Sequence, residues 1–289
     1  MSSLTVWNFT RIKGVLYLSA IMAHHSLYIT PEIKLSVYHD SFSVDNVVFA
    51  DHLLIWFIEG ETKIIMPDAT YTLTPGDIFL FPRNSVATII NSPKGGKPNQ
   101  SVVMHLNAEK LKNYYKEKAI DPGIPSGKMY TFHSHPLLKS CLASLIPYFE
   151  IGEQLPAEIA DIKISEAIAV LRSIKPEIDN VLANFEEPGK IDLTGFMEKH
   201  YMFNMDMEKF GYLSGRSLTT FRRDFKNTYG TTPQKWLTQK RLELAHFHIK
   251  EKRRRPSDIY LEVGFENLSH FSFAFKKLFG YPPTEVGAI

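Results

Sequence analysis

The spacing of apolar residues changes near residue 106, from the alternation of strands to the period of helices. Between residues 33 and 106 the chain is a series of short β-rich runs such as "LLIWFIEG" and "ATYTLTPGDIFLFP". Turn signals such as Glu-Gly, Pro-Asp and Pro-Gly-Asp separate these runs. Strands of this length and spacing are typical of an antiparallel barrel or sandwich rather than a parallel sheet.

Residues 107 to about 185 carry the helical period. The runs "LNAEKLKNYYKEKAI", "HPLLKSCLASLIPYFE" and "AEIADIKISEAIAVLRS" are each predicted to form a helix, and Pro136 suits the first turn of the second. Pro176 interrupts the pattern before "EIDNVLANF". We expect the apolar residues of the third run to form a core with some contact to a second copy of the chain, and the pattern does not separate these two roles. These residues are Ile159, Ile162, Ile168, Val170 and Leu171.

A charged Pro-Gly segment, "EEPGK", ends this region and predicts a linker at residues 187–190. After it the same amphipathic pattern occurs twice, in "GRSLTTFRRDFKNTYGTTP" and in "ENLSHFSFAFKKLFGYPP". In each segment the apolar residues form one stripe of a helix. The stripe of the first segment is Leu218, Phe221 and Phe225, and that of the second is Leu268, Phe271, Phe275 and Leu278.

Each of these helices follows a shorter helix and a tight turn, which is the pattern of a helix-turn-helix motif. The first motif is predicted at about residues 206–229. Asp206–Leu213 forms its first helix and Ser214–Arg216 forms its turn. Ser217 is expected to cap the second helix, and Gly230 is expected to end it.

The second motif is predicted at about residues 257–279. Asn267 is expected to cap its second helix and Gly280 to end it. In motifs of this kind the second helix enters the major groove of DNA. The first helix of this second motif is expected to contain Ile259, Leu261 and Val263.

The segment "TPQKWLTQKRLELAHFHIKE" joins the two motifs and is predicted to form one helix over about residues 233–251, because Pro233 can occupy its first turn. About 18 residues at ~1.5 Å each give a rod of ~27 Å. A rod of that length can hold two recognition helices roughly one DNA turn, ~34 Å, apart on one face of the duplex. The repeat therefore predicts that one chain contacts two successive segments of the major groove.

Composition is that of a globular protein whose charge is placed unevenly. Hydrophobic residues make up 44% of the 289-residue chain, which allows buried cores. Residues 190–289 hold 17 Lys/Arg and 11 Asp/Glu, a net charge of +6, whereas the remainder carries −4. A basic C-terminal third favours a polyanion such as double-stranded DNA as its partner.

Cys141 is the only cysteine in the sequence, so an internal disulfide is excluded and a reducing cytoplasm is the expected location. The apolar run "GVLYLSAIMA", at Gly14–Ala23, is too short for a membrane span, which takes ~20 residues. It is also not followed by the small-residue cleavage site of a signal peptide. We therefore expect no membrane association, and translation from Met22 instead of Met1 stays open as an alternative.

Residues 190–289 resemble the DNA-binding domain of the AraC/XylS family of bacterial transcription regulators. The resemblance rests on "S-x-x-x-F-x-R-x-F-K-x-x-x-G-x-x-P" at Ser217–Pro233, on "R-L-E-L-A" at Arg241–Ala245 and on "I-x-x-x-V-G-F-E-N-L-S-H-F" from Ile259. The N-terminal strands resemble more loosely, through "TPGDIFLFPRNSV", the family's cupin-like sensing barrel. The implied fold class is α+β and multidomain. Residues 1–186 form a cupin-like β-barrel with helices for sensing and dimerisation, and residues 191–289 form an all-α domain with two helix-turn-helix motifs.

The resemblance implies a sequence-specific transcription regulator without enzymatic activity, an activator in preference to a repressor. It also implies RNA polymerase as a partner and a homodimer at least on DNA. Three positions depart from the family pattern. Tyr260 stands where the family usually has a small residue, Phe273 stands where an arginine is common, and Glu208–Gly211 replaces the usual Leu-Ala start of the first motif.

Side chains on the outward faces of the two recognition helices are the candidate DNA contacts. Arginine is the best reader of guanine, threonine reads bases less selectively, and lysine more often meets phosphate. Phe273 can touch a thymine methyl group. The basic run Lys252–Arg255 is either a phosphate clamp or a solvated loop. The candidates are Arg216, Ser217, Thr219, Thr220, Arg223, Lys226, Asn267, Ser269, His270, Phe273 and Lys277.

Control of DNA binding has two competing explanations at the level of the sequence. A barrel of this size can enclose one small-molecule effector, and its aromatic residues are candidates for the pocket. The same aromatics are suited to filling the interior, in which case a protein partner would control the regulator. The candidate pocket residues are Tyr38, Phe49, Trp56, Phe57, Phe79 and Phe81.

A metal or catalytic site is not expected. His133 and His135 lie at a helix start, and His246 and His248 lie on a helix, where residues two apart do not face one ligand. No nucleophile motif, glycine-rich phosphate loop or carboxylate pair occurs in the sequence. We therefore expect no cofactor and no metal, and a cupin enzyme fused to a DNA-binding domain is the least favoured alternative.

Overall fold

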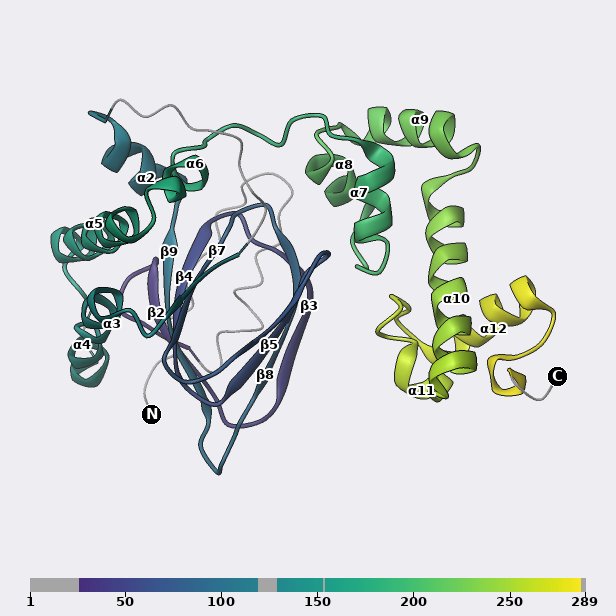
Figure 1. The fold of residues 1–289 in the computed structure, drawn as a ribbon, viewed down its shortest axis with the longest axis horizontal. Helices are drawn as coiled ribbons and strands as arrows, with labels where there is room; N and C mark the ends of the chain where they lie inside the picture. Colours follow the sequence, from purple (N-terminus) through teal and green to yellow (C-terminus); the bar gives the residue numbers. More distant parts are fainter. Residues whose placement is uncertain (1–25, 119–128, 153, 287–289) are drawn as a thin grey trace, which may run out of the picture.

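Two antiparallel sheets lie face to face in the N-terminal part of the chain, and the C-terminal part is a group of helices beside them (Figure 1). The structure is a computed structural model that describes residues 26–118, 129–152 and 154–286. The expectations for Gly14–Ala23 and Met22 lie outside the described residues. Layers run from a set of helices through the two sheets to the C-terminal helices (Figure 1).

Among the described residues, six strands form the first sheet in the order β1-β2-β9-β4-β7-β10. Neighbouring strands are antiparallel throughout. The sequence places β1 and β10 outside the predicted strand region of residues 33–106, so both are additions to the prediction. The strands are β1 Ser26–Tyr28, β2 Ile33–Tyr38, β9 Asn99–Leu106, β4 His52–Glu59, β7 Asp77–Phe81 and β10 Tyr130–His133.

Four strands of the described chain form the second sheet in the order β3-β8-β5-β6. Its inner face packs on the first sheet, and Phe57 and Phe79 stack in the core between the sheets with ring centroids 5.5 Å apart. The predicted antiparallel, cupin-like architecture is confirmed. The expectation of a barrel is corrected to a sandwich, because the described strands pair as two separate sheets. The strands are β3 Phe42–Val48, β8 Val86–Ser92, β5 Glu61–Ile65 and β6 Thr70–Leu73.

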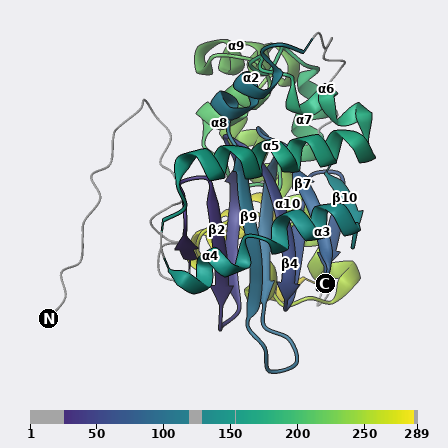
Figure 2. The ribbon, with the colours of Figure 1, turned by 90° about the vertical axis from the view of Figure 1, so that its left-hand side faces the viewer.

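A layer of helices covers the outer face of the first sheet (Figure 2). Leu138 of α3 and Ile168 of α5 are fully buried in this layer, whereas Ile162 of α5 is 64% exposed. The prediction of a single helix over "HPLLKSCLASLIPYFE" is wrong, because α3 ends at Ala143 and α4 begins at Ile146. Pro147 explains the break, since a proline ring clashes with the carbonyl four residues earlier in a continuous helix. The helices are α2 Ala108–Tyr115, α3 Pro136–Ala143, α4 Ile146–Ile151, α5 Ala157–Ile174, the 3₁₀ turn η2 Pro176–Ile178 and α6 Asp179–Leu182.

The C-terminal helices pack into two small cores that share one long helix. Trp236 and Leu237, near the start of α10, belong to the core around α8 and α9. Leu242 and Ile249, toward the other end of α10, belong to the core around α11 and α12. The elements are α7 Leu193–His200, α8 Met207–Leu213, α9 Leu218–Tyr229, α10 Pro233–Lys252, α11 Pro256–Ile259, α12 Leu268–Phe279 and the 3₁₀ turn η3 Pro283–Glu285.

The C-terminal helices lie against the outer face of the second sheet (Figure 1). Val86 of β8 is buried in the core around α8 and α9. The side-chain oxygen of Asn46 accepts a hydrogen bond from the Asn204 backbone N–H at 2.8 Å. Cavities of about 600, 380 and 340 Å³ lie along this boundary between the sheets and the helices. The two parts therefore touch through a few specific contacts with open space between them.

The segment that leads into the linker is bound to the edge of the sandwich by Arg83. Its Nη2 donates to the backbone carbonyl of Asn184 at 3.1 Å and to that of Glu186 at 2.7 Å. The backbone N–H of Arg83 in turn donates to Nδ1 of His52, whose side chain is 2% exposed. His52 and Arg83 thus form a fixed point at which the linker leaves the sandwich.

Burial of His52 is expected to make the folded chain lose stability as the pH falls below about 6.5. Burial, with the nearby Arg83 cation, lowers the pKa of His52 to about 3, and Asp51 opposes this shift. Between these two pH values the unfolded chain binds a proton that the folded chain does not. The free energy of unfolding therefore falls by up to ~1.4 kcal/mol for each unit by which the pH is lowered. His52→Asn keeps the acceptor for Arg83 and removes the titrating ring.

Urea unfolding at pH 7.5, 6.0 and 5.0 checks this expectation. The loss of unfolding free energy from pH 6.0 to 5.0 should be about 1 kcal/mol smaller in His52→Asn than in the unmodified chain. Equal pH dependence in the His52→Asn variant and the unmodified chain would contradict the assignment of a buried neutral His52.

Candidate nucleic-acid interface

The first helix-turn-helix motif has the boundaries that the sequence predicts. The Asp206 carboxylate caps α8 by accepting from the Lys209 backbone N–H at 2.7 Å. Ser217 caps α9 by accepting from the Thr220 N–H at 3.3 Å, and Gly230 ends α9 in the left-handed conformation. The side chains of Asp206 and Ser217 each accept a hydrogen bond from a backbone N–H that has no partner inside its helix. The starts of α8 and α9 are therefore fixed by local contacts.

Aromatic packing fixes which side of α9 faces outward. Phe221 and Phe225 are fully buried, and their rings lie against Phe210 of α8 and Trp236 of α10 at centroid distances of 6.3 and 5.7 Å. Because residues three and four apart share a helix face, the positions between these phenylalanines point away from the core. The sequence-predicted residues Thr219, Arg223 and Lys226 are exposed on this outer side.

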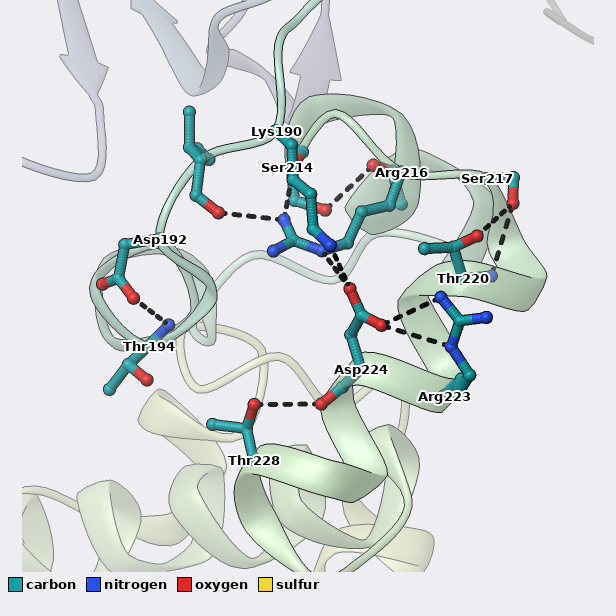
Figure 3. A network of polar contacts seen from close by, with 12 residues as sticks. Lys190, Asp192, Thr194, Ser214, Arg216, Ser217, Thr220, Arg223, Asp224 and Thr228 are labelled. Atoms are coloured by element: carbon teal, nitrogen blue, oxygen red, sulfur yellow. Dashed lines mark hydrogen bonds and ion pairs between the residues drawn. The ribbon is translucent and has the colours of Figure 1, made fainter.

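Arg216 does not lie on the outer side of α9, and the expectation that it projects outward is wrong. Its side chain is 6% exposed and turns inward (Figure 3). Its Nε lies 3.2 Å from Oδ2 of Asp224, and its Nη1 donates to the carbonyls of Ile191 and Ser214 at 3.0 and 2.7 Å. The sequence could not show this arrangement, because the partners of Arg216 include the Ile191 carbonyl, 25 residues away in the chain.

The second motif has the predicted turn and second helix but a shorter first helix. Asn267 caps α12 by accepting from the His270 N–H at 2.7 Å, and Gly280 ends the helix in the left-handed conformation. The first helix, α11, ends at Ile259, directly before the unusual Tyr260. Leu261 therefore lies in a turn and is 58% exposed, which corrects the expectation that it belongs to the helix.

The inward stripe of α12 is narrower than predicted. Phe271 and Phe275 are fully buried, whereas Leu268 and Leu278 are 39% and 42% exposed. The other side of α12 carries the predicted candidates, and all of them are exposed. These are Asn267, Ser269, His270, Phe273 and Lys277.

Arg241 joins the segment between α7 and α8 to the second motif, and it has no counterpart among the residues that the sequence singles out as functional. Its Nε and Nη2 donate to the carbonyls of Tyr201 and Phe203, each at 2.9 Å. Its Nη1 donates to the carbonyl of Gly264, in the turn of the second motif, at 3.0 Å. An arginine between the buried Leu237 and Leu242 of an otherwise apolar helix face is the sequence signal that could have found it.

The basic run Lys252–Arg255 is only partly available to a polyanion. Arg253 ends α10 in the left-handed conformation at φ +53°. Arg254 pairs with Glu262 at 2.5 and 2.8 Å, within the second motif. Lys252 and Arg255 are exposed. The run is therefore partly a structural element that ties the end of α10 to the segment after α11.

The candidate effector pocket is only partly assembled inside the sandwich. A cavity of about 70 Å³ between the sheets is lined by Tyr38, Phe49, Phe57 and Phe79 among others. Phe81 is buried in the same core. Trp56 is a wrong assignment, because it packs on the opposite face of the first sheet among the helices. Adjacent residues of a strand point to opposite faces, so Trp56 and Phe57 cannot line one pocket.

The described residues are also expected to hold no metal site and no membrane-spanning helix. In the parts of the chain that the structure describes, no group of three or more metal-ligating side chains comes together. His246, considered as a ligand, has its Nε2 2.9 Å from the Tyr281 hydroxyl. No helix in the described ranges is both long and apolar enough to cross a membrane.

Known protein families match both the N-terminal and the C-terminal part of the chain. A family described as "Helix-turn-helix domain" matches residues 213–288, and one described as "ExsA N-terminal regulatory domain" matches residues 52–176. The HTH-type transcriptional regulator ExsA of Pseudomonas aeruginosa is 27% identical over 238 residues, which cover 78% of this chain and 82% of that protein. The virulence regulon transcriptional activator VirF of Yersinia enterocolitica is 24% identical over 237 residues, which cover 79% and 86%.

Among solved structures, ToxT of Vibrio cholerae aligns over 88% of this chain and 97% of its own, with a TM-score of 0.42 and 14% identity. The two capped helix-turn-helix motifs and the matches to both parts of the chain define a DNA-binding transcription regulator. These matches support an AraC family transcription regulator, as the sequence predicts.

Proposed function

We propose that α9 and α12 read two successive segments of the major groove and that the chain activates transcription from the sites it binds. The observation that carries this proposal is the mounting of both helices on α10, whose 20 residues span ~30 Å. That length is close to the ~34 Å of one DNA turn. Activation is favoured because a relative that matches over most of its length is named as a transcriptional activator.

The DNA contacts that we propose are the candidates on the outer sides of the two helices, which are exposed except for the half-buried Thr220. Arg223 is the strongest candidate for reading a base, since guanine offers a bidentate acceptor to arginine. Lys226 and Lys277 suit phosphate contacts, which position the protein without selecting a sequence. The remaining proposed contacts are Ser217, Thr219, Thr220, Asn267, Ser269, His270 and Phe273.

We also propose a division of labour along the chain. Residues 1–186 serve sensing and dimerisation, residues 187–190 link, and residues 191–289 bind DNA. The exposed Ile162 of α5 supports a contact between two copies of the sensing part. In this scheme the chain acts in the cytoplasm as a homodimer on DNA together with RNA polymerase, and it catalyses no reaction of its own.

Control of DNA binding is proposed to act through the N-terminal part. The cavity of about 70 Å³ inside the sandwich is well below the ~300–1,000 Å³ of typical ligand pockets. A small-molecule effector would therefore have to open the interior or bind elsewhere, and this favours the alternative of a protein partner. A thermal-melt screen of the full chain against metabolites separates the two, because a ligand that binds only the folded state raises the melting temperature with concentration.

Arg223→Ala is expected to lower discrimination between specific and unrelated DNA by about 1–3 kcal/mol, or ~5- to 150-fold. Duplexes selected by the unmodified chain from a randomised pool provide the specific DNA, and a scrambled duplex provides the comparison. The binding constants of both duplexes, measured across a range of salt concentrations, give the result. Lys139→Ala, an exposed change on α3 of the opposite layer, should leave discrimination unchanged. Equal discrimination by Arg223→Ala and the unmodified chain would remove the base-reading role of α9.

A further inference from the structure

Asp224 is an acidic residue on the proposed DNA-reading helix, and it is surrounded by three cations (Figure 3). Its Oδ2 lies 2.9 Å from Nζ of Lys190 and 3.2 Å from Nε of Arg216. Its Oδ1 lies 3.4 Å from both Nε and Nη2 of Arg223. One carboxylate therefore contacts the linker, the turn of the first motif and the proposed base-reading arginine.

The cations keep Asp224 ionised and compensate its charge. Hydrogen bonds from Lys190 first, and then from Arg216 and Arg223, lower the pKa of Asp224 to about 2. An uncompensated anion on α9 would repel the DNA backbone. Lys190 and Arg216 together more than neutralise the carboxylate, so Arg223 can transfer to DNA without leaving an unpaired anion on the helix.

The contacts of Arg223 with Asp224 are long enough to be exchanged. Both distances are 3.4 Å, beyond the ~2.7–2.9 Å of a strong charge-assisted hydrogen bond. The Arg223 side chain is 67% exposed, whereas that of Arg216 is 6% exposed. Arg216 is thus a fixed partner of Asp224, and Arg223 is a loosely held one that remains available to DNA.

The linker is attached at the same place. The Ile191 carbonyl accepts from Arg216, and the Ile191 N–H donates to the Ser214 carbonyl at 3.3 Å. Lys190, the preceding residue, reaches Asp224. Since Arg83 holds Glu186, the residue before the linker, on the sandwich, a movement of the sandwich would act on Asp224 through the linker and Lys190.

We propose that Asp224 is a positioning residue that orients Arg223 for base reading, and that Lys190 makes this orientation depend on the linker. The inference rests on the proposed function, because it requires α9 to enter the major groove. The linker is then part of the specificity of the first motif. In this arrangement, loss of the contact from Lys190 to Asp224 lowers the selectivity of DNA binding more than its strength.

The test compares Asp224→Asn and Lys190→Gln in the full chain, with selected and scrambled duplexes. Asp224→Asn removes one negative charge, so binding to the scrambled duplex should stay equal or rise, while discrimination falls about tenfold. Lys190→Gln should lower discrimination about three- to tenfold. Lys209→Gln on α8 removes the same charge beside an exposed Asp206 and should change discrimination less than twofold. Unchanged discrimination in both Asp224→Asn and Lys190→Gln would overturn the proposal.

A double-mutant cycle separates positioning from a general structural effect. If Lys190 acts through Arg223, then Lys190→Gln should have no effect on discrimination in an Arg223→Ala chain. An equal effect in both backgrounds would overturn the proposal. Lys190 is 59% exposed, so its replacement keeps the test valid if Asp224→Asn fails to fold. If the proposed base reading by α9 were itself wrong, Arg223→Ala alone would leave discrimination intact. That result distinguishes failure of the proposed function from failure of the positioning role.

Discussion

Replacing Arg241 with methionine is expected to destabilise the C-terminal helices by about 3–5 kcal/mol, because it leaves several backbone carbonyls without their hydrogen-bond donor. The methionine fills a similar volume, but the carbonyls of Tyr201, Phe203 and Gly264 lose their donor. Buried carbonyls without partners are costly, at roughly 1–3 kcal/mol each. Urea unfolding of the full chain, followed by tryptophan fluorescence, measures the loss.

Lys240→Met is the matched control for this change. Lys240 precedes Arg241 on the same helix, and its partner Glu198 is partly exposed. Partly exposed ion pairs contribute about 0–1 kcal/mol, so the control should remain close to the unmodified chain. If Arg241→Met and Lys240→Met were equally mild, Arg241 would not be the residue that holds the segment before α8 to the second motif.

Gly215→Ala is expected to displace the linker from the first motif and to abolish selective DNA binding. Gly215 has φ +70°, and a Cβ at this position would lie 2.1 Å from the carbonyl oxygen of Gly189. Backbone atoms of the linker would have to move, because no flexible side chain can absorb so close a contact. The expected result is a chain with a lower melting temperature and with discrimination reduced at least tenfold between selected and scrambled duplexes.

Gly230→Ala separates the clash from the strain of a left-handed backbone. Gly230 has a similar φ of +68°, and no atom lies within 4 Å of the position that a Cβ would take there. It should therefore show only the cost of a non-glycine residue in this conformation, roughly 1–2 kcal/mol. Similar melting temperatures and DNA selectivity in both variants would mean that the contact between the linker and the turn has no influence on DNA reading.

The parts of the fold that depend on local chemistry are predictable from the sequence. The caps Ser217 and Asn267 and the terminal glycines of α9 and α12 follow from side chains that bond to their own helix ends. The alternation of the strands likewise predicts the antiparallel sheets. Trp56 shows that alternation could have been used further, since it excludes Trp56 from the face of Phe57.

The parts that depend on partners distant in the sequence are not predictable in this way. Arg216 has the same local pattern as an outward arginine, and only Asp224 and the Ile191 carbonyl turn it inward. Arg241 similarly draws the Gly264 carbonyl toward α10, which accompanies the early end of α11. In both cases a tertiary contact, and not helix propensity, determines where the charge lies.

The helix α10 also fixes an angle between the two reading helices. Its 20 residues form one uninterrupted element, and a core at each end prevents the two motifs from turning independently. In B-form DNA an extra base pair rotates the following bases by about 35° and moves them ~3.4 Å along the axis. A rigid helix cannot follow that rotation, so binding sites with one base pair inserted between the two contacted segments should engage only one motif. In the proposed binding mode, the length of α10 therefore selects the spacing within the operator as well as the size of the footprint.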